Sequence, residues 1–318
     1  MRIAIMVIDG MFDTGLSSVL DTLTMANELA PLQGKRPPFV IEVVSVRKRV
    51  RTALGMEIPT VRFDADQGFD WILVPALGSK TPETLDAALK RADVRDASAA
   101  LVKASKRGAR LAAACTGTYV LAATGMLRGR AATTTWWLSA DFRARFPAVT
   151  LDETRMVVED GHCLTAGAAL AHVDLALYLV RQHSPSLAQL VGRYLLVDDR
   201  PSQMSYVILD HLSHSDPVVE RFERWTRENL RDFSMTEAAR AVGTTERTLQ
   251  RRLRKVLGRT PIAYVQDLRV EQAIHLLRTT DQSVDEIAEI VGYQEGVTLR
   301  TLLRDKTGRG VRELRRGT

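Results

Sequence analysis

Two stretches of similar sequence in the last third of the chain constrain its fold more than any other feature. The first, SMTEAARAVGTTERTLQRRLRKVLG, spans residues 234–258, and the second, SVDEIAEIVGYQEGVTLRTLLRDKTG, spans residues 283–308. Each opens with Ser-x-x-Glu, a capping box that predicts the start of a helix. Each continues through Val-Gly to Leu-x-x-x-Leu, the pattern of a helix, a glycine turn and a second helix. Two matched helix-turn-helix units arise by chance far less often than one.

The second helix of the first unit has one apolar and one basic face. Leu249, Leu253 and Val256 recur at helical spacing and predict a buried stripe. Guanidinium groups on the opposite face can reach phosphates or the edge of guanine, although a basic face is also compatible with simple solvation. The residues expected to face DNA on the two second helices are Arg247, Gln250, Arg251, Arg254, Val297, Arg300, Thr301 and Arg304. The four residues of the later helix, Val297, Arg300, Thr301 and Arg304, include fewer polar side chains. We therefore expect this helix to contribute less to base recognition and more to positioning the protein on DNA.

The segment from Pro217 to Arg316 resembles the DNA-binding domain of the AraC/XylS family. Besides the two units, it has the GRTP and VGY signatures of that family and, from Pro261 to Arg278, the pattern of a stiff connecting helix. The resemblance implies an all-α domain with two helix-turn-helix motifs that binds double-stranded DNA. Leu299 and Leu303 stand where the family usually has Phe, and Val311 where it often has Pro, which we interpret as variation in packing.

The first 195 residues predict an α/β domain with a largely parallel, flavodoxin-like sheet. Apolar runs predict strands over residues 3–8, 39–46, 71–74 and 110–114, and they alternate with helical patterns, including one helix that continues through Lys106. Arg155–Glu159 and Cys163–Thr165 predict a hairpin that turns at Asp160-Gly161. Residues 196–216 are expected to link this domain to the DNA-binding domain at 217–318.

Cys115 lies at a predicted turn from strand to helix, in the sequence AACTGTYVLAATGMLRGRAATTTWW. A sharp turn of this kind exposes a nucleophile in some enzymes, whereas a small buried cysteine is the simpler interpretation. The stretch is similar to the class I glutamine-amidotransferase-like domain of the PfpI superfamily, and in particular to GlxA-type regulators that join it to an AraC-type domain. That resemblance places Cys115 at the nucleophile position and Asp21 nearest to the acidic position. Because open α/β sheets bind ligands in the crevice above their strand ends, we also expect a ligand site there, with Asp21, Gly78, Cys115, Thr116 and Thr135 as its residues.

Thr135 stands where those regulators typically have His, and it cannot act as a base near neutral pH. None of the six histidines occupies that position in the sequence, although a distant one could fold inward. We therefore expect a catalytically inactive domain that senses a small metabolite, for which the resemblance suggests amino acids or quaternary amines. The helical patterns at 170–179 and 187–197 predict either a surface that pairs two copies or the domain's own core.

Composition agrees with a soluble cytoplasmic protein. The net charge is +6, two cysteines imply no disulfide framework, and the N-terminus has no signal-peptide pattern. His211 and His214 lie within the bridge, where we expect polar surface residues and not a metal site. No cofactor is expected.

The sequence therefore predicts a sequence-specific, DNA-binding transcription regulator that forms a homodimer, with RNA polymerase as a possible further partner. One alternative is a cysteine amidase, hydrolase or glyoxalase-like enzyme joined to a DNA-binding domain. Another is an architectural DNA-binding protein without an effector.

Overall fold

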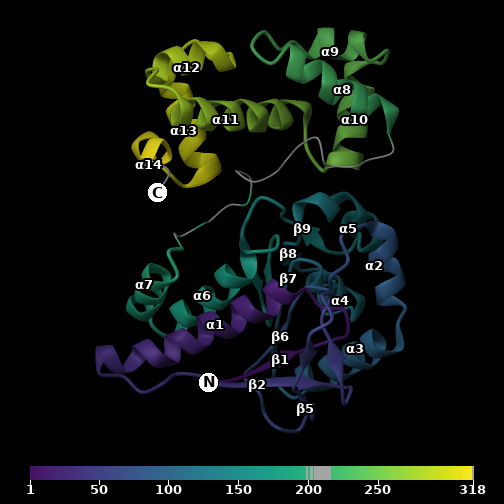
Figure 1. Cartoon of the computed structure of the whole chain (residues 1–318). Coiled ribbons are helices and arrows are strands. Elements are labelled where there is room, and N and C mark those ends of the chain that lie inside the picture. The colour runs from purple at the N-terminus through teal and green to yellow at the C-terminus, as the bar shows by residue number, and fades with distance from the viewer. Residues whose placement is uncertain (198–199, 201–202, 204–215, 317–318) are drawn as a thin grey trace. The chain divides into compact units, whose positions relative to one another are not determined.

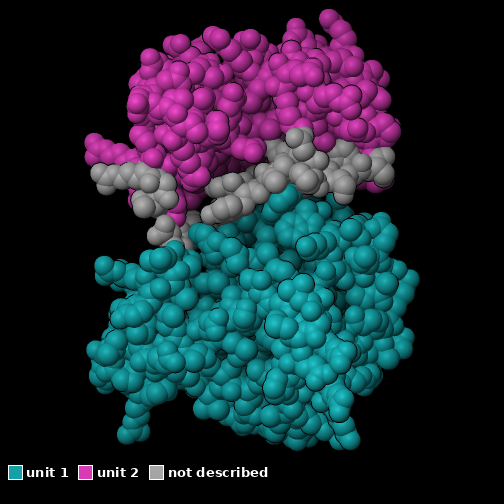
Figure 2. Space-filling view, viewed as in Figure 1, with its two compact units in different colours: residues 1–203 teal, residues 204–318 magenta. Residues whose placement is uncertain are grey.

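The computed structural model describes residues 1–197, 200, 203 and 216–316, which divide into two compact units, residues 1–203 and 204–318 (Figures 1 and 2). The first unit extends past residue 195, where the sequence suggested an end, because Gln203 is buried in it. His211 and His214 lie outside the described residues, as does most of the expected linker.

The strands of the first unit form one central sheet of seven and two small pairs. The strands are β1 (Arg2–Met6), β2 (Val40–Ser45), β3 (Val50–Arg51), β4 (Glu57–Ile58), β5 (Val61–Arg62), β6 (Trp71–Val74), β7 (Arg110–Ala114), β8 (Ala131–Ala132), β9 (Thr150–Leu151), β10 (Val157–Asp160) and β11 (Cys163–Ala166). The central order is β10-β11-β7-β6-β1-β2-β5, and every neighbouring pair is parallel except β10 with β11. The expected mostly parallel sheet and its terminal hairpin are confirmed.

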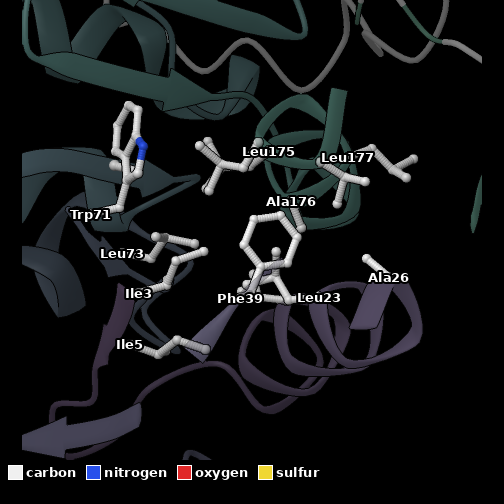
Figure 3. Packing of buried hydrophobic residues seen from close by; sticks show 14 of the residues in the cluster. Ile3, Ile5, Leu23, Ala26, Phe39, Trp71, Leu73, Leu175, Ala176 and Leu177 are labelled. Carbon is white, nitrogen blue, oxygen red and sulfur yellow. The ribbon is translucent and has the colours of Figure 1, made fainter. Parts of the chain in front are cut away.

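Helices cover both faces of the sheet (Figure 1). They are α1 (Asp13–Leu29), η1 (Ala30–Gln33), α2 (Pro82–Leu89), α3 (Ala92–Ser105), α4 (Gly117–Ala123), η2 (Trp136–Leu138), α5 (Ser139–Arg145), α6 (Ala171–His183) and α7 (Pro185–Tyr194). On β1, Ile3 and Ile5 point toward α1 and α6, as Figure 3 shows, whereas Ala4 and Met6 join the core on the other face. Strand side chains alternate between faces, so a strand covered on both sides must be apolar throughout.

The expected single helix before residue 106 is two helices. Arg91, between α2 and α3, has extended backbone (ψ 149°), and its guanidinium binds the Asp93 carboxylate and the carbonyl oxygen of Asp9. These interactions stabilise a break that helical periodicity does not reveal. The two-residue strands β3, β4, β5 and β9 were also not expected, because so short a strand leaves no alternating pattern.

Helices α6 and α7 contribute their apolar stripes to the core of the first unit. Leu175, Leu179, Leu187 and Val191 are buried against α1 and the sheet. Of the two interpretations of these stripes, the structure therefore supports the intramolecular core.

The second unit is helical in its described part. It contains α8 (Pro217–Glu228), α9 (Met235–Ala241), α10 (Glu246–Leu257), α11 (Pro261–Thr279), α12 (Val284–Val291), α13 (Gly296–Thr307) and α14 (Val311–Arg316). The two expected helix-turn-helix units are α9 with α10 and α12 with α13, and α11 connects them (Figure 1). Ser283 and Glu286 form a complete capping box, whereas Ser234 only accepts from the Glu237 amide and the return bond is not formed.

Candidate functional site

The second helices of the two helix-turn-helix motifs, α10 and α13, have the same construction. Both end at a glycine in the left-handed conformation, Gly258 (φ 68°) and Gly308 (φ 71°). Leu249 and Leu253 of α10 are buried, as are Leu299 and Leu303 at the matching positions of α13. The third buried residue of α10 is Leu257 and not the expected Val256, which is only half-buried.

All eight residues expected to face DNA are exposed. On α10 they are Arg247, Gln250, Arg251 and Arg254, and on α13 they are Val297, Arg300, Thr301 and Arg304. No described residue binds the guanidinium group of Arg247, Arg251 or Arg254 through a hydrogen bond or ion pair, so these groups are available to a ligand. Arg252 is different, because it pairs with Asp216 at 2.9 Å and has a structural role.

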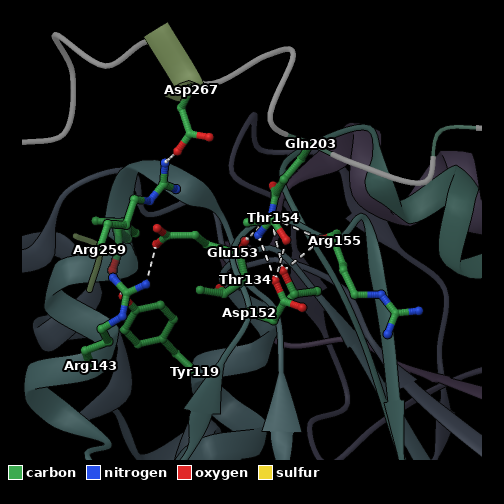
Figure 4. Close-up of polar contacts among 12 residues, drawn as sticks. Tyr119, Thr134, Arg143, Asp152, Glu153, Thr154, Arg155, Gln203, Arg259 and Asp267 are labelled. Atoms are coloured by element: carbon green, nitrogen blue, oxygen red, sulfur yellow. Dashed lines mark hydrogen bonds and ion pairs between the residues drawn. The ribbon is translucent and has the colours of Figure 1, made fainter. Parts of the chain in front are cut away.

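A buried carboxylate on α11 connects the two helix-turn-helix motifs of the second unit. Asp267 pairs with Arg259, which follows α10, at 2.7 Å, and with Lys306 of α13 at 2.8 Å; Figure 4 shows the first pair. Asp267 is only 7 % exposed, and breaking a buried ion pair is strongly destabilising. The two recognition helices, α10 and α13, are therefore held through one residue of the connecting helix.

Arg300 and the start of α13 are fixed by Asp285 of α12. Its carboxylate accepts from the Gly296 amide at 3.1 Å and pairs with the Arg300 guanidinium at 3.4 Å. A Cβ atom at Gly296 would lie 2.2 Å from the same carboxylate, so glycine is required for this approach.

In the first unit, Cys115 lies at the carboxyl end of β7, directly before α4. Its φ of 54° is positive, which is uncommon for a residue with a side chain and characteristic of a strained turn. The Cys115 amide donates to the carbonyl oxygens of Ala166 and Gly167. A Cβ at Gly117 would lie 2.4 Å from the Val74 carbonyl oxygen, so the turn also depends on that glycine.

The Cys115 thiol is buried and weakly acidic. Burial raises its pKa to about 11, and a bond from the Thr116 amide offsets this only in part. A nucleophilic cysteine needs thiolate at neutral pH, and this environment disfavours it.

His172 folds into this end of the sheet from α6. Its Nε2 accepts from the Ala76 amide at 3.1 Å, and its Nδ1 is 2.6 Å from the Ala169 carbonyl oxygen, to which it donates. Burial lowers the pKa of His172 to about 4, so the ring is neutral. Because both ring nitrogens bind the backbone, this geometry leaves no nitrogen to accept a proton from Cys115.

The five residues expected to form a ligand site are only partly brought together. Cys115, Thr116 and Thr135 are buried, and the Thr116 hydroxyl donates to the Leu77 carbonyl oxygen at 2.7 Å. The Gly78 amide donates to Gly10, and a Cβ there would lie 2.5 Å from the Ala53 side chain, so Gly78 permits a close chain approach. Asp21 is exposed on α1 and is therefore not one of the buried members of this set.

Gly15 is the α1 residue against which His172 packs. A Cβ at Gly15 would lie 2.7 Å from His172 Nε2, so no larger side chain fits there. The role of Gly15 was missed from the sequence, because contact with a residue of α6 leaves no local signal.

The buried hydroxyls near Cys115 are only partly satisfied. Thr118, whose amide donates to the Cys115 carbonyl oxygen, has a hydroxyl group without a hydrogen-bond partner among the described residues, and the Thr135 hydroxyl faces the Cys115 thiol, whose pKa it helps to lower. Buried polar groups of this kind usually bind water, an ion or a ligand.

Comparison with known proteins identifies both halves. Residues 1–182 match the DJ-1/PfpI family, and residues 238–317 match a helix-turn-helix domain. The chain belongs to the DJ-1/PfpI family. It joins a DJ-1/PfpI domain to an AraC-type helix-turn-helix domain. The narrower match to GlxA-type regulators stays a prediction.

Its relatives are transcription regulators by name. The chain is 26% identical to the HTH-type transcriptional regulator GbdR of Pseudomonas aeruginosa, over 99% of this chain and 84% of GbdR. It is 29% identical to the HTH-type transcriptional regulator ArgR of the same species, over 67% of this chain and 66% of ArgR. A THiJ/PfpI family protein from Pseudomonas syringae has a similar fold, with a TM-score of 0.50 and 24% identity, over 63% of this chain and 76% of that one.

The described residues can also be considered for metal binding and for membrane-spanning helices. Within them, no group of three or more His, Cys, Asp and Glu side chains could hold a metal ion. No helix in the described part of the chain is long and apolar enough to cross a membrane.

Proposed function

We propose that this protein is a sequence-specific, DNA-binding transcription regulator of the cytoplasm. The observation that carries the proposal is the pair of matched helices, α10 and α13, each held by buried leucines and each exposing four residues at equivalent positions. An exposed basic face on a helix of this kind suits the major groove, which admits an α-helix. The regulators to which the chain is similar support the same function.

Selection from random-sequence double-stranded DNA tests this proposal. The full-length protein is expected to enrich a defined sequence, and its affinity for that sequence should fall steeply with salt as counterions are released. Enrichment of no sequence, or equal affinity for enriched and unselected DNA at matched salt, would overturn the proposal.

The first unit serves, in this proposal, as a sensor without enzymatic activity. The raised pKa of the Cys115 thiol and the two backbone bonds of His172 argue against a thiolate–imidazole pair. The buried Thr118 hydroxyl, which has no partner among the described residues, and the Thr135 hydroxyl beside the Cys115 thiol support a ligand with polar groups. Thermal-shift measurements of the full-length protein with a metabolite library test this role, and an effector should stabilise the wild type more than Thr135→Val.

Pairing of two copies through the first unit would extend the DNA site. Tyr194 and Leu196, at the end of α7, are 59 % and 92 % exposed and offer apolar surface for such an interface. An effector then acts through its different affinities for two arrangements of the paired DNA-binding units. RNA polymerase is the expected partner at a promoter.

A further inference from the structure

The two recognition helices expose different chemistry at the same positions. Each residue of α10 corresponds to the residue 50 positions later in α13, as the buried pairs Leu249/Leu299 and Leu253/Leu303 show. Position by position, Arg247 is therefore replaced by Val297, and Arg251 by Thr301. All four side chains are exposed.

Val297 is an apolar side chain on the face that is otherwise charged or polar. It is 63 % exposed in the first turn of α13. Arg300 and Arg304, three and seven residues further along the helix, are exposed on the same face. An isolated exposed valine is ordinary on a protein surface. Whether Val297 belongs to a binding surface therefore depends on its neighbour one turn away.

That neighbour, Thr301, presents its methyl group. Its hydroxyl donates to the Val297 carbonyl oxygen at 3.1 Å. With the hydroxyl turned back onto the helix, the methyl group is the part of Thr301 left to contact a ligand. Residues four apart on a helix are neighbours, so the methyl groups of Val297 and Thr301 form one small apolar surface.

In the major groove, thymine alone among the four bases carries a methyl group, and apolar side chains and threonine methyl groups contact it. Cytosine has a hydrogen at C5 where thymine has the methyl group, so it would leave the same apolar surface without this contact. Arginine at the matching positions of α10 favours guanine, because its guanidinium binds the O6 and N7 atoms of that base.

We propose that α13 is a thymine reader, in which Val297 and Thr301 contact the 5-methyl group of thymine in the second half of the DNA site. The inference rests on the proposed DNA-binding function. It differs from the sequence-based expectation that α13 contributes less base reading and more positioning. It also makes the two half-sites chemically different, one read by arginines and the other by methyl contacts.

The test removes single methyl groups from DNA. Deoxyuridine replaces each thymine in turn in the second half of the sequence that the full-length protein enriches, which changes the base only by loss of the methyl group. Wild-type affinity should fall about fourfold at the contacted thymine, the effect of one lost apolar carbon. The same replacement outside the contacted bases should change affinity by less than about twofold.

Protein variants test the same contact from the protein side. Val297→Ala should bind the thymine site more weakly and no longer distinguish thymine from deoxyuridine at the contacted position. Thr301→Ser, which also removes one methyl group, should reduce this discrimination. Thr279→Ser is the matched control, because Thr279 of α11 is also exposed and donates its hydroxyl to the carbonyl oxygen four residues earlier, at 2.8 Å.

The outcomes distinguish failure of the thymine assignment from failure of the proposed DNA-binding function. If a sequence is enriched but deoxyuridine binds like thymine at every position, or Val297→Ala discriminates as well as wild type, the thymine assignment is wrong and the DNA-binding function stands. If no sequence is enriched, the proposed function fails and the assignment fails with it.

Discussion

Gln203 Nε2 donates a hydrogen bond to the Thr134 carbonyl oxygen, 3.1 Å away, although the residues lie 69 positions apart in the chain. The same amide group donates to the Thr133 hydroxyl, and its oxygen accepts from the Ala168 amide. Figure 4 shows this side chain above Thr134. Because Thr134 in turn donates to the Cys115 carbonyl oxygen at 2.7 Å, the end of the first unit is tied to the cysteine turn.

Gln203→Ala should therefore destabilise the first unit. It leaves buried donors and acceptors without partners, at a cost of about 1–3 kcal/mol. Hydrogen exchange of peptides that cover residues 110–135 should speed up in the full-length variant. Gln189→Ala, which removes an exposed glutamine of α7, is the control and should leave those rates unchanged.

Arg251→Ala should weaken specific DNA binding and leave the fold intact. Loss of a bidentate base contact costs about 1–3 kcal/mol of discrimination, and the exposed side chain makes no contact that the fold needs. Titration at matched salt, with enriched and unselected DNA, measures the effect. Arg224→Ala removes one exposed charge from α8 and serves as the control; an Arg251→Ala affinity equal to that of the control would show that the assigned face is wrong.

Half-site spacing should matter if two copies pair. Each chain carries two recognition helices, and consecutive major-groove segments lie about 34 Å apart. Moving one copy's site by about five base pairs rotates it to the opposite side of the duplex. Footprinting should then show loss of joint binding, whereas a shift of about ten base pairs should restore part of it; equal binding at every spacing would contradict pairing.

Cys115 should react slowly with thiol reagents in the folded protein. A pKa near 11, against an ordinary value of 9.0, leaves about one hundredth of the usual thiolate at neutral pH. Iodoacetamide labelling of a Cys163→Ala variant, in which Cys115 is the remaining cysteine, measures this rate. Fast labelling at pH 7 would contradict the buried, neutral thiol.

Cys115→Ala should keep specific DNA binding, and the wild type should show no amidase, protease or glyoxalase turnover above background. Turnover that disappears in Cys115→Ala would establish the enzyme alternative.

Acid should destabilise the first unit through His172. The folded protein holds the pKa of this ring near 4, below its ordinary 6.5, because burial disfavours the charged form. The unfolded chain takes up the proton first, so stability is full above pH 6.5 and is lost as pH falls toward 4, by up to about 3 kcal/mol. Hydrogen exchange of α6 from pH 7 to 4, corrected for intrinsic rates, should show this loss in wild type and a smaller one in His172→Gln.

The repeated motif by itself determined the all-α domain and its eight outward residues. Helical periodicity sorts residues of one helix into faces, and a stripe of leucines fixes which face is buried. The apolar strand runs determined the parallel sheet for the same reason, since only a strand covered on both faces can be apolar throughout. Cys115 was also placed correctly at its turn, because small residues and Gly117 mark it locally.

Only the tertiary structure decided the chemistry around Cys115. The exposure of Asp21, the inward fold of His172 and the burial of Gln203 depend on contacts between residues far apart in the chain. The fixed relation of α10 to α13 likewise depends on Asp267, which reaches Arg259 and Lys306 from a third helix. Sequence patterns report which face of an element is apolar; they do not report which distant backbone group or charge that face will meet, and such contacts set the protonation of a buried side chain.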